Sequence, residues 1–104
     1  MQIPGHIEGF QWDKANKEKS WDKHRVTWRE CEEVFFNFPL FTYPDLKHSK
    51  KDIRHGALGQ TDGSRLLFVV FTARGSKIRV ISARAMNRKE RKEYHEKAQK
   101  DSKI

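Results

Sequence analysis

The second half of the chain holds the strongest run of hydrophobic positions. Residues 66–71 are all apolar, and residues 77–83 resume strand-forming side chains after a turn. A short apolar run bounded by turn residues is typical of a strand, and its unbroken apolarity predicts burial on both faces of a sheet. Asp62-Gly63 is a strong hairpin signal, so residues 54–61 are expected to pair with this run. The pattern predicts an antiparallel meander of three strands.

The clearest helical pattern lies upstream of the meander. Thr27 and Glu30 have the spacing of a capping box, and Pro39 ends the segment. Apolar side chains recur between them at helical spacing and predict one buried helix face. We expect the cysteine on this face to be a buried structural thiol rather than a nucleophile. The face consists of Trp28, Cys31, Val34, Phe35 and Phe38.

Two further helices are predicted at either end of the chain. Asp13 can cap a helix that runs to His24, although the apolar face of this helix is thin. Asn87 and Glu90 have the spacing of a helix start, which predicts a basic helix over residues 88–100. Together these segments frame the meander with helices before and after it.

The elements combine into an α+β fold. Short strands are expected near residues 10–12 and 41–43, before the meander. The predicted architecture is a small antiparallel sheet, the three-stranded meander plus short N-terminal strands, with two N-terminal helices and a basic C-terminal helix on one side. Residues 1–104 are expected to form a single domain, with a flexible lead over 1–9 and a flexible tail over 97–104.

The charge composition of the chain predicts an anionic partner. The formal net charge is +8 and the pI is about 9.8. Nucleic acid, an acidic protein or an anionic membrane surface would each fit such a charge, and so would a merely solvated basic surface. A single cysteine excludes an internal disulfide and favours a reducing compartment. With neither a signal peptide nor a membrane span in the sequence, we expect a cytoplasmic protein.

The sequence lacks the motifs of most enzyme classes. The histidines lack the spacing of a metal site, and phosphate-cradling glycine loops are missing, so we expect neither metal nor cofactor. Cleavage of RNA remains, because it needs a base, an acid and cations that stabilise the phosphorane. Arg79 and Arg84 are five residues apart, so regular alternation would place them on opposite faces unless the turn after Arg84 changes this. The groups available are Lys23, His24, Arg54, His55, Arg79, Arg84, Glu90, Arg91 and Tyr94.

Each of these arginines could instead have a purely structural role. It would then form a surface ion pair with Asp52, Glu90 or Glu93. From the residues alone, the chain is a binder of anions.

The order and spacing of several short motifs resemble the BrnT family of bacterial type II toxins. The resemblance runs from Gly9 to about Glu96 and covers most of the chain. The matching pieces are Phe10-x-Trp12-Asp13, the lysine-rich residues 14–19, Lys23-His24-x-Val26, Glu32-Glu33-Val34-Phe35-Phe36, Asp52-x-Arg54, residues 57–61, residues 67–72, Arg74-Gly75, residues 78–85 and Glu90-Arg91-x-x-Tyr94.

The resemblance implies a fold similar to the RelE ribonuclease toxins and a metal-independent ribonuclease that arrests translation. It also implies a BrnA-like antitoxin, which blocks the toxin and through which the complex contacts promoter DNA. The catalytic candidates that it implies are His24, Arg54, Arg84, Glu90 and Tyr94, and the candidates for binding RNA phosphate are Lys23, Arg79 and Arg91. Arg54 and Arg84 are expected to clamp phosphate. His24 or Glu90 is expected to transfer protons.

The chain departs from the family pattern at three positions. Ile53 stands where an acid is common, although Asp52 lies one residue earlier. Arg25 stands where glycine is usual, and Ser20 where asparagine is frequent. These departures keep a second hypothesis open, a weak or inactive toxin relative that only binds an antitoxin or RNA. A repressor that binds a promoter alone is disfavoured, because the sequence has no helix-turn-helix pattern.

Overall fold

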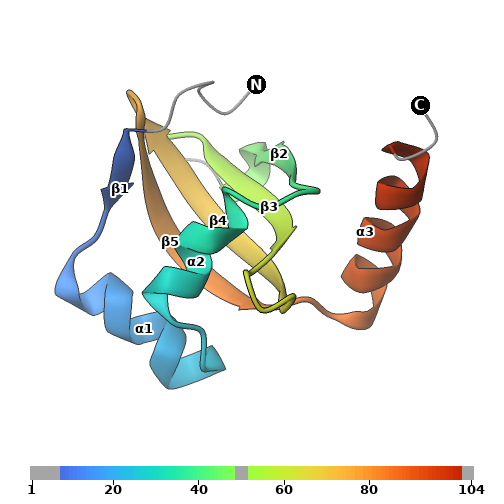
Figure 1. Ribbon diagram of the computed structural model, residues 1–104. Helices are drawn as coiled ribbons and strands as arrows, with labels where there is room; N and C mark the ends of the chain where they lie inside the picture. The colour runs from blue at the N-terminus through green and yellow to red at the C-terminus, as the bar shows by residue number, and fades with distance from the viewer. Residues whose placement is uncertain (1–7, 49–51, 102–104) are drawn as a thin grey trace.

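The computed structural model describes residues 8–48 and 52–101, and its ribbon is shown in Figure 1. The elements are β1 (Gly9–Gln11), α1 (Lys14–His24), α2 (Trp28–Val34), β2 (Phe41–Asp45), the 3-10 helix η1 (Leu46–His48), β3 (Arg54–Gln60), β4 (Leu66–Arg74), β5 (Lys77–Ala85) and α3 (Arg88–Asp101). The predicted α+β class is confirmed.

The five strands form one mixed sheet in the order β1-β5-β4-β3-β2. The neighbouring pairs from β2 to β5 are antiparallel, which confirms the meander. However, β1 runs parallel to β5, with Phe10 opposite Ile78, so the prediction of a wholly antiparallel sheet is wrong. A tight hairpin forces antiparallel pairing, but β1 and β5 are separated by most of the chain, so no such constraint applies to them.

Helices cover both faces of the sheet, and the prediction that they lie on one side is wrong. In Figure 1, α1 and α2 lie over one face, where Cys31 and Val34 of α2 join the main core. On the opposite face, Tyr94 of α3 packs with Leu58 and Met86 in a smaller cluster. We call the face under α1 and α2 the core face; its buried hydrophobic strand residues are Ala57, Leu67, Val69, Phe71, Ile78, Val80 and Ala83, and His55 of β3 is buried among them with its ring stacked on Phe71.

Strand β4 is less buried than its unbroken apolar run predicted. Val69 and Phe71 point to the core face and are buried, whereas Phe68 and Val70 point to the other face and are only half-buried. The prediction of burial on both faces is therefore wrong. The reason is that α3 covers only part of the second face, whose remaining surface is left to solvent and to polar side chains.

Helix α2 is shorter than the helix predicted over residues 27–38. The capping box at its start is confirmed, but the helix ends at Val34. The turn that follows is held by the side-chain amide of Asn37, which donates a hydrogen bond of 3.1 Å to the carbonyl oxygen of Gln60. Phe38, which was predicted to lie in the core, is 88% exposed because the chain turns away before it.

The β3–β4 hairpin forms around Asp62-Gly63, as predicted. Its positive backbone angle falls on the next residue, Ser64, with φ of 67°. The N–H of Thr61 donates to the carbonyl oxygen of Arg65 at 2.9 Å and closes the loop. The sequence signal thus located the turn, while the strained position lies one residue further on.

Helix α3 continues to Asp101, and the Lys97 ammonium lies 3.3 Å from the Glu93 carboxylate. Residues 1–7, 49–51 and 102–104 are outside the part of the chain that the structure describes, so most of the predicted lead and the last three residues of the predicted tail fall there, while residues 97–101 belong to α3. Among the described residues, no helix is long and apolar enough to cross a membrane.

Candidate active site

A β-bulge in β5 determines where the arginines point. The pairing register shifts between Val70 and Phe71 of β4, which leaves Ile81 of β5 as an extra, unpaired residue. One extra residue reverses the alternation of side chains beyond it. Arg79 and Arg84, on either side of Ile81, therefore point to the same face. The turn after Arg84, which the sequence suggested as the cause, is not needed.

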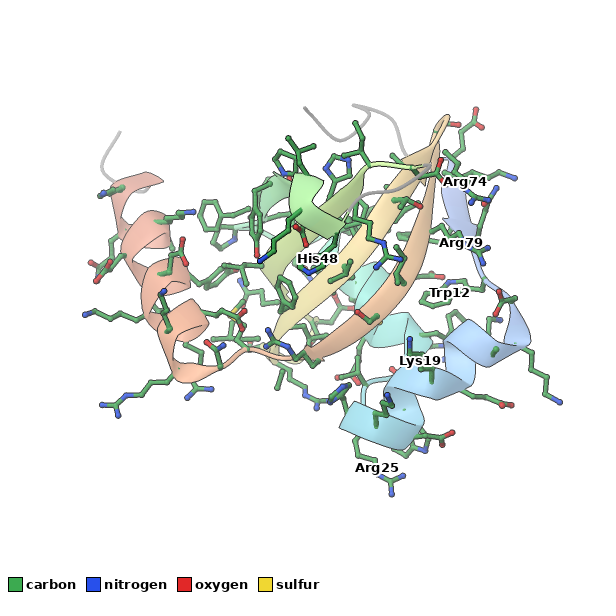
Figure 2. All side chains as sticks on the ribbon, turned by 180° about the vertical axis from the view of Figure 1, so that it is seen from behind. Trp12, Lys19, Arg25, His48, Arg74 and Arg79 are labelled. Carbon is green, nitrogen blue, oxygen red and sulfur yellow. The ribbon has the colours of Figure 1, made fainter. Side chains whose placement is uncertain are left out.

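The strand register confirms that three predicted arginines share this face. Arg54 and Arg79 both pair with Thr72, and Arg84 pairs with Phe68. Since Thr72 and Phe68 are four residues apart on one strand, they point the same way. We call this side of the sheet, which carries Arg54, Arg79 and Arg84, the arginine face. Figure 2 looks onto it from behind the view of Figure 1.

Pairing across β2, β3, β4 and β5 arranges the arginine face in three rows. Neighbouring rows are two residues apart along each strand, or about 7 Å, except that the bulge adds one residue between Arg79 and Ser82 of β5. The end row nearest η1 is polar, the middle row is mostly small, and the third row lies beneath α3. In the order of the strands the rows are Asp45, Arg54, Thr72 and Arg79; Tyr43, Gly56, Val70 and Ser82; and Phe41, Leu58, Phe68 and Arg84.

Arg84 is fixed by contacts on three sides. Its Nη1 and Nη2 atoms donate to the two carboxylate oxygens of Glu90 at 2.8 and 2.9 Å. Nη1 also donates to the carbonyl oxygen of Ala85 at 3.1 Å, and the guanidinium lies 4.5 Å from the ring centre of Phe68. The Arg84 side chain is nevertheless 36% exposed. It is a positioned cation that a ligand can still reach.

Glu90 is also fixed in position, by hydrogen bonds at the start of its own helix. Its N–H donates to the Asn87 side chain at 2.8 Å, and its carboxylate accepts from the Asn87 N–H at 2.9 Å, which confirms the predicted helix start. Burial acts to raise the pKa of Glu90, but the hydrogen bonds from Arg84 and from the Asn87 backbone outweigh it and lower that pKa. The hydrogen bond to Glu90 raises the pKa of Arg84. Both groups are therefore charged at neutral pH.

Tyr94 lies below this pair rather than beside it. Its side chain is buried, its hydroxyl donates to the carbonyl oxygen of Pro39 at 2.6 Å, and its ring packs edge-on against Phe41. Burial raises the pKa of the Tyr94 hydroxyl. This geometry supports a role in anchoring α3 to the sheet.

Lys23 and His24 end α1, and α1 packs on the core face side of the molecule. Both side chains are exposed. The guanidinium of Arg65 donates to the His24 carbonyl oxygen at 3.3 Å and so ties the end of α1 to the start of β4. Among the described residues, neither Lys23 nor His24 has a hydrogen bond or ion pair with Arg84. The structure therefore does not bring the two motifs into direct contact.

The other predicted phosphate-binding residues have local partners. Arg79 lies 3.0 Å from the Asp13 carboxylate at the start of α1, and Arg91 donates to the Met86 carbonyl oxygen at 2.8 Å. Figure 2 shows Arg79 near the β1 edge of the sheet. The ion-pair alternative is correct for Arg84, whose partner Glu90 it names, whereas Arg79 pairs with Asp13, which it does not name. These pairs are exposed enough to exchange for a phosphate.

Two features of the arginine face were missed in the sequence. Tyr43 occupies the middle row, and His48 of η1 holds the Asp45 carboxylate with its Nδ1 atom at 2.8 Å. In Figure 2, His48 lies over the arginine face. The spacing Asp45-x-x-His48 was the available signal, but without the position of β2 nothing indicated that it faces the arginines.

The described residues contain no group of three or more His, Cys, Asp or Glu side chains able to hold a metal ion. The predicted burial of Cys31 is confirmed. Burial, with smaller contributions from Glu30 and Glu32, raises the pKa of its thiol to about 12. A thiol that stays protonated at neutral pH is a poor nucleophile.

Comparison with known proteins assigns the chain to a class. A family model described as "Ribonuclease toxin, BrnT, of type II toxin-antitoxin system" matches residues 12–90. The chain belongs to this BrnT family of ribonuclease toxins. An RNA substrate and an antitoxin partner are implied by that membership.

A solved structure supports the same fold. The 1.1 Å crystal structure of the Brucella abortus ribonuclease toxin BrnT is similar, with a TM-score of 0.59. The two chains are 24% identical, and the match covers 77% of this chain and 97% of the Brucella chain. Comparison with curated proteins finds no match.

Proposed function

We propose that this protein is an endoribonuclease toxin whose active site is the arginine face, centred on Arg84 and Glu90. The observation that carries the proposal is the position of Arg84, which is fixed on three sides yet accessible, in a chain of the BrnT family. A rigid guanidinium stabilises a phosphorane well, because it needs little reorganisation when the charge develops. A fold relationship to the RelE toxins belongs to the same proposal.

The reaction needs only protein side chains. The 2′-hydroxyl oxygen attacks the adjacent phosphorus, and the bond from phosphorus to the 5′-oxygen breaks. A base takes the 2′ proton, an acid protonates the leaving 5′-oxygen, and the products are a 2′,3′-cyclic phosphate and a 5′-hydroxyl. Arg84 stabilises the phosphorane, while Arg54, Arg79, Arg91 and Lys23 bind flanking phosphates. We therefore propose cleavage without a metal ion.

The positions of the side chains reduce the number of candidates for proton transfer. Glu90 is ionised and bonded to Arg84 by both oxygens, which favours an orienting role for it. His24 remains a candidate from the family motif, and His48 is a second histidine, oriented by Asp45 and placed over the arginine face. Cleavage measured with His24→Ala and His48→Ala decides between them. The histidine that transfers a proton is the one whose loss lowers kcat by about 100-fold or more.

The biological setting follows from the family. We propose that cleavage arrests translation, that a BrnA-like antitoxin neutralises the toxin, and that the complex contacts promoter DNA through the antitoxin. An acidic antitoxin would match the net charge of +8. Action in the cytoplasm, on free or ribosome-bound RNA, is part of the proposal.

The deciding experiment compares two arginines of equal exposure. Arg84 and Arg65 have side chains 36% and 37% exposed, and each forms an ion pair with a glutamate. Purified wild-type protein should cleave single-stranded RNA with or without a metal chelator. Arg84→Ala should lower the rate about 100- to 1,000-fold, whereas Arg65→Ala, which touches this region only through the backbone of His24 and Arg25, should lower it far less.

Growth after induction in a bacterial host provides the matching test in cells. Arrest by the wild type and normal growth with Arg84→Ala would agree with the proposal. Intact RNA and normal growth with folded wild-type protein would instead support the binding-only relative. Ile53, 41% exposed where an acid is common, would then be the first position to restore.

A further inference from the structure

Tyr43 lies in the middle row of the arginine face, on the edge strand β2, and Arg84 lies one row away on β5, three strands across the sheet. It pairs with Gly56 of β3, and Gly56 pairs in turn with Val70 of β4. The side chain is 39% exposed, which is high for a large aromatic residue at a strand centre. Glu90 and Glu93 contribute to raising the pKa of Tyr43, after burial, and Arg84 opposes them. These charges couple Tyr43 electrostatically to the proposed catalytic pair.

Gly56 sets the position of the Tyr43 ring. A Cβ atom built on Gly56 would lie 2.7 Å from Cζ, 2.8 Å from Cε2 and 2.8 Å from the hydroxyl oxygen of Tyr43. The ring thus lies flat across the glycine, with one face on the backbone of β3. An aromatic ring backed by a strand leaves its other face outward, which is the arrangement of base-stacking platforms on nucleic-acid-binding sheets.

The adjacent row provides a place for a phosphate. Thr72 is 4% exposed, and its Oγ1 atom has no hydrogen-bond partner among the described residues. It lies between Arg54 and Arg79 in the strand register, about 7 Å from the row of Tyr43. An unsatisfied buried hydroxyl between two guanidinium-bearing residues gains a partner when an anion binds. Asp45 ends this row on β2, and Asp13 pairs with Arg79 at its other end.

We propose that Tyr43 and Thr72 form a nucleotide subsite of the RNA substrate, with the base stacked on the Tyr43 ring and the phosphate bound at Thr72 between Arg54 and Arg79. The subsite accommodates the nucleotide next to the cleaved bond at Arg84. It rests on the proposed function, because it assumes that RNA binds along the arginine face. Stacking accepts any base, so the subsite contributes affinity and alignment rather than base specificity.

The test is a double-mutant cycle in which one change is made in the protein and the other in the RNA. The RNA is a single-stranded oligonucleotide cleaved by the wild type at one mapped bond, with an abasic nucleotide placed singly at each flanking position. Tyr43→Ala should lower kcat/KM about 10- to 100-fold, while Tyr43→Phe should stay near wild type. At one flanking position the abasic nucleotide should cause the same loss in the wild type and no further loss in Tyr43→Ala. If Tyr43 were only structural, the loss from Tyr43→Ala and the loss from the abasic nucleotide would multiply at every flanking position. That result would overturn the proposal.

Three further variants control the test. Gly56→Ala should lower cleavage like Tyr43→Ala by displacing the ring, and should add nothing in the Tyr43→Ala background. Thr72→Val, which keeps the shape, should weaken binding about 3- to 10-fold. Trp21→Ala removes an aromatic residue 45% exposed on α1 and should leave cleavage unchanged. Full cleavage by Thr72→Val would remove the phosphate half of the subsite.

Failure of the subsite is distinguishable from failure of the proposed function. Binding is measured with the same oligonucleotides carrying a 2′-deoxy nucleotide at the mapped bond, which cannot be cleaved. If the wild type binds RNA but does not cleave it, the same combinations of protein variant and oligonucleotide are compared by their dissociation constants instead of kcat/KM. Non-additive losses between Tyr43→Ala and the abasic nucleotide then support the subsite in a binding-only protein, and additive losses reject it.

Discussion

The two faces of one sheet serve different purposes in this protein. The core face is apolar, covered by α1 and α2, and buries nearly every strand residue that it carries. The arginine face alternates with it along the same strands, carries Arg54, Arg79 and Arg84, and is covered only in part by α3. The first face provides the stability of the fold, and the second uses that rigidity to hold cations in fixed positions.

The difference between the faces depends on a single extra residue. If Ile81 took a regular place in the alternation instead of forming a bulge, Arg79 and Arg84, five residues apart, would point to opposite faces. The bulge lets Ile78 and Val80 enter the core together with Ala83, while both arginines stay outside. A local irregularity of the backbone is thus what aligns the cations of the candidate site.

Val80→Arg should have the largest effect. Val80 is 1% exposed in the core, so the substitution would bury an unpaired charge, which costs more than a small protein can lose. We expect no folded protein by circular dichroism. Ser82→Arg is the matched control and should fold, because the bulge at Ile81 places residue 82 on the arginine face. Unfolding of both variants would mean that residues 80 and 82 share a face, as they would in a strand without the bulge.

Neighbouring valines on β4 test the two faces with the same substitution. Val69 is fully buried on the core face, and Val70 is half-buried on the arginine face. Val69→Ala should lower the free energy of unfolding by about 2–3 kcal/mol, and Val70→Ala by about 1 kcal/mol, as measured in urea. Equal losses would mean that the arginine face is packed as tightly as the core.

Much of this division was predictable from local sequence. The meander, the hairpin at Asp62-Gly63 and two helix starts have strong local signals, because turn and capping chemistry act over three or four residues. The direction of β1 and the face chosen by α3 were not predictable. They depend on contacts between distant segments, such as Phe10 opposite Ile78 and Tyr94 on Leu58, which have no local signature.

The candidate site was predictable in its residue types but less so in its geometry. Arg84 and Glu90 were named from the sequence, and they form the bidentate pair of the structure. The shared face of the arginines required the bulge, which an apolar pattern with one extra residue does not reveal. Tyr43 was overlooked because its importance lies in the glycine beneath its ring, on another strand.

Glu90→Gln should have an intermediate, pH-dependent effect on the arginine face. The pKa of Glu90 is lowered in the folded protein, so its contribution to stability is present above its ordinary pKa of 4.5 and is lost as the pH falls through the lowered value. At pH 7 the substitution should cost about 1–2 kcal/mol in urea unfolding. The gap from the wild type should shrink below pH 4.5. A gap that stays constant with pH would mean that the charge of Glu90 does not stabilise the fold.

The smallest expected effect concerns Arg25, at the end of a core-face helix. Arg25 follows α1 with φ of 54°, a left-handed conformation that favours glycine and explains why the family usually has glycine there. Its guanidinium also lies 5.2 Å from the ring centre of Trp21, so Arg25→Ala serves as the reference that removes this contact. Arg25→Gly should be about 1 kcal/mol more stable than Arg25→Ala in urea unfolding, because only glycine relieves the strain. Both variants should cleave RNA like the wild type if the core face contributes stability alone. A loss of cleavage in both would mean that the side chain of Arg25 contributes to the site, next to the proposed roles of Lys23 and His24.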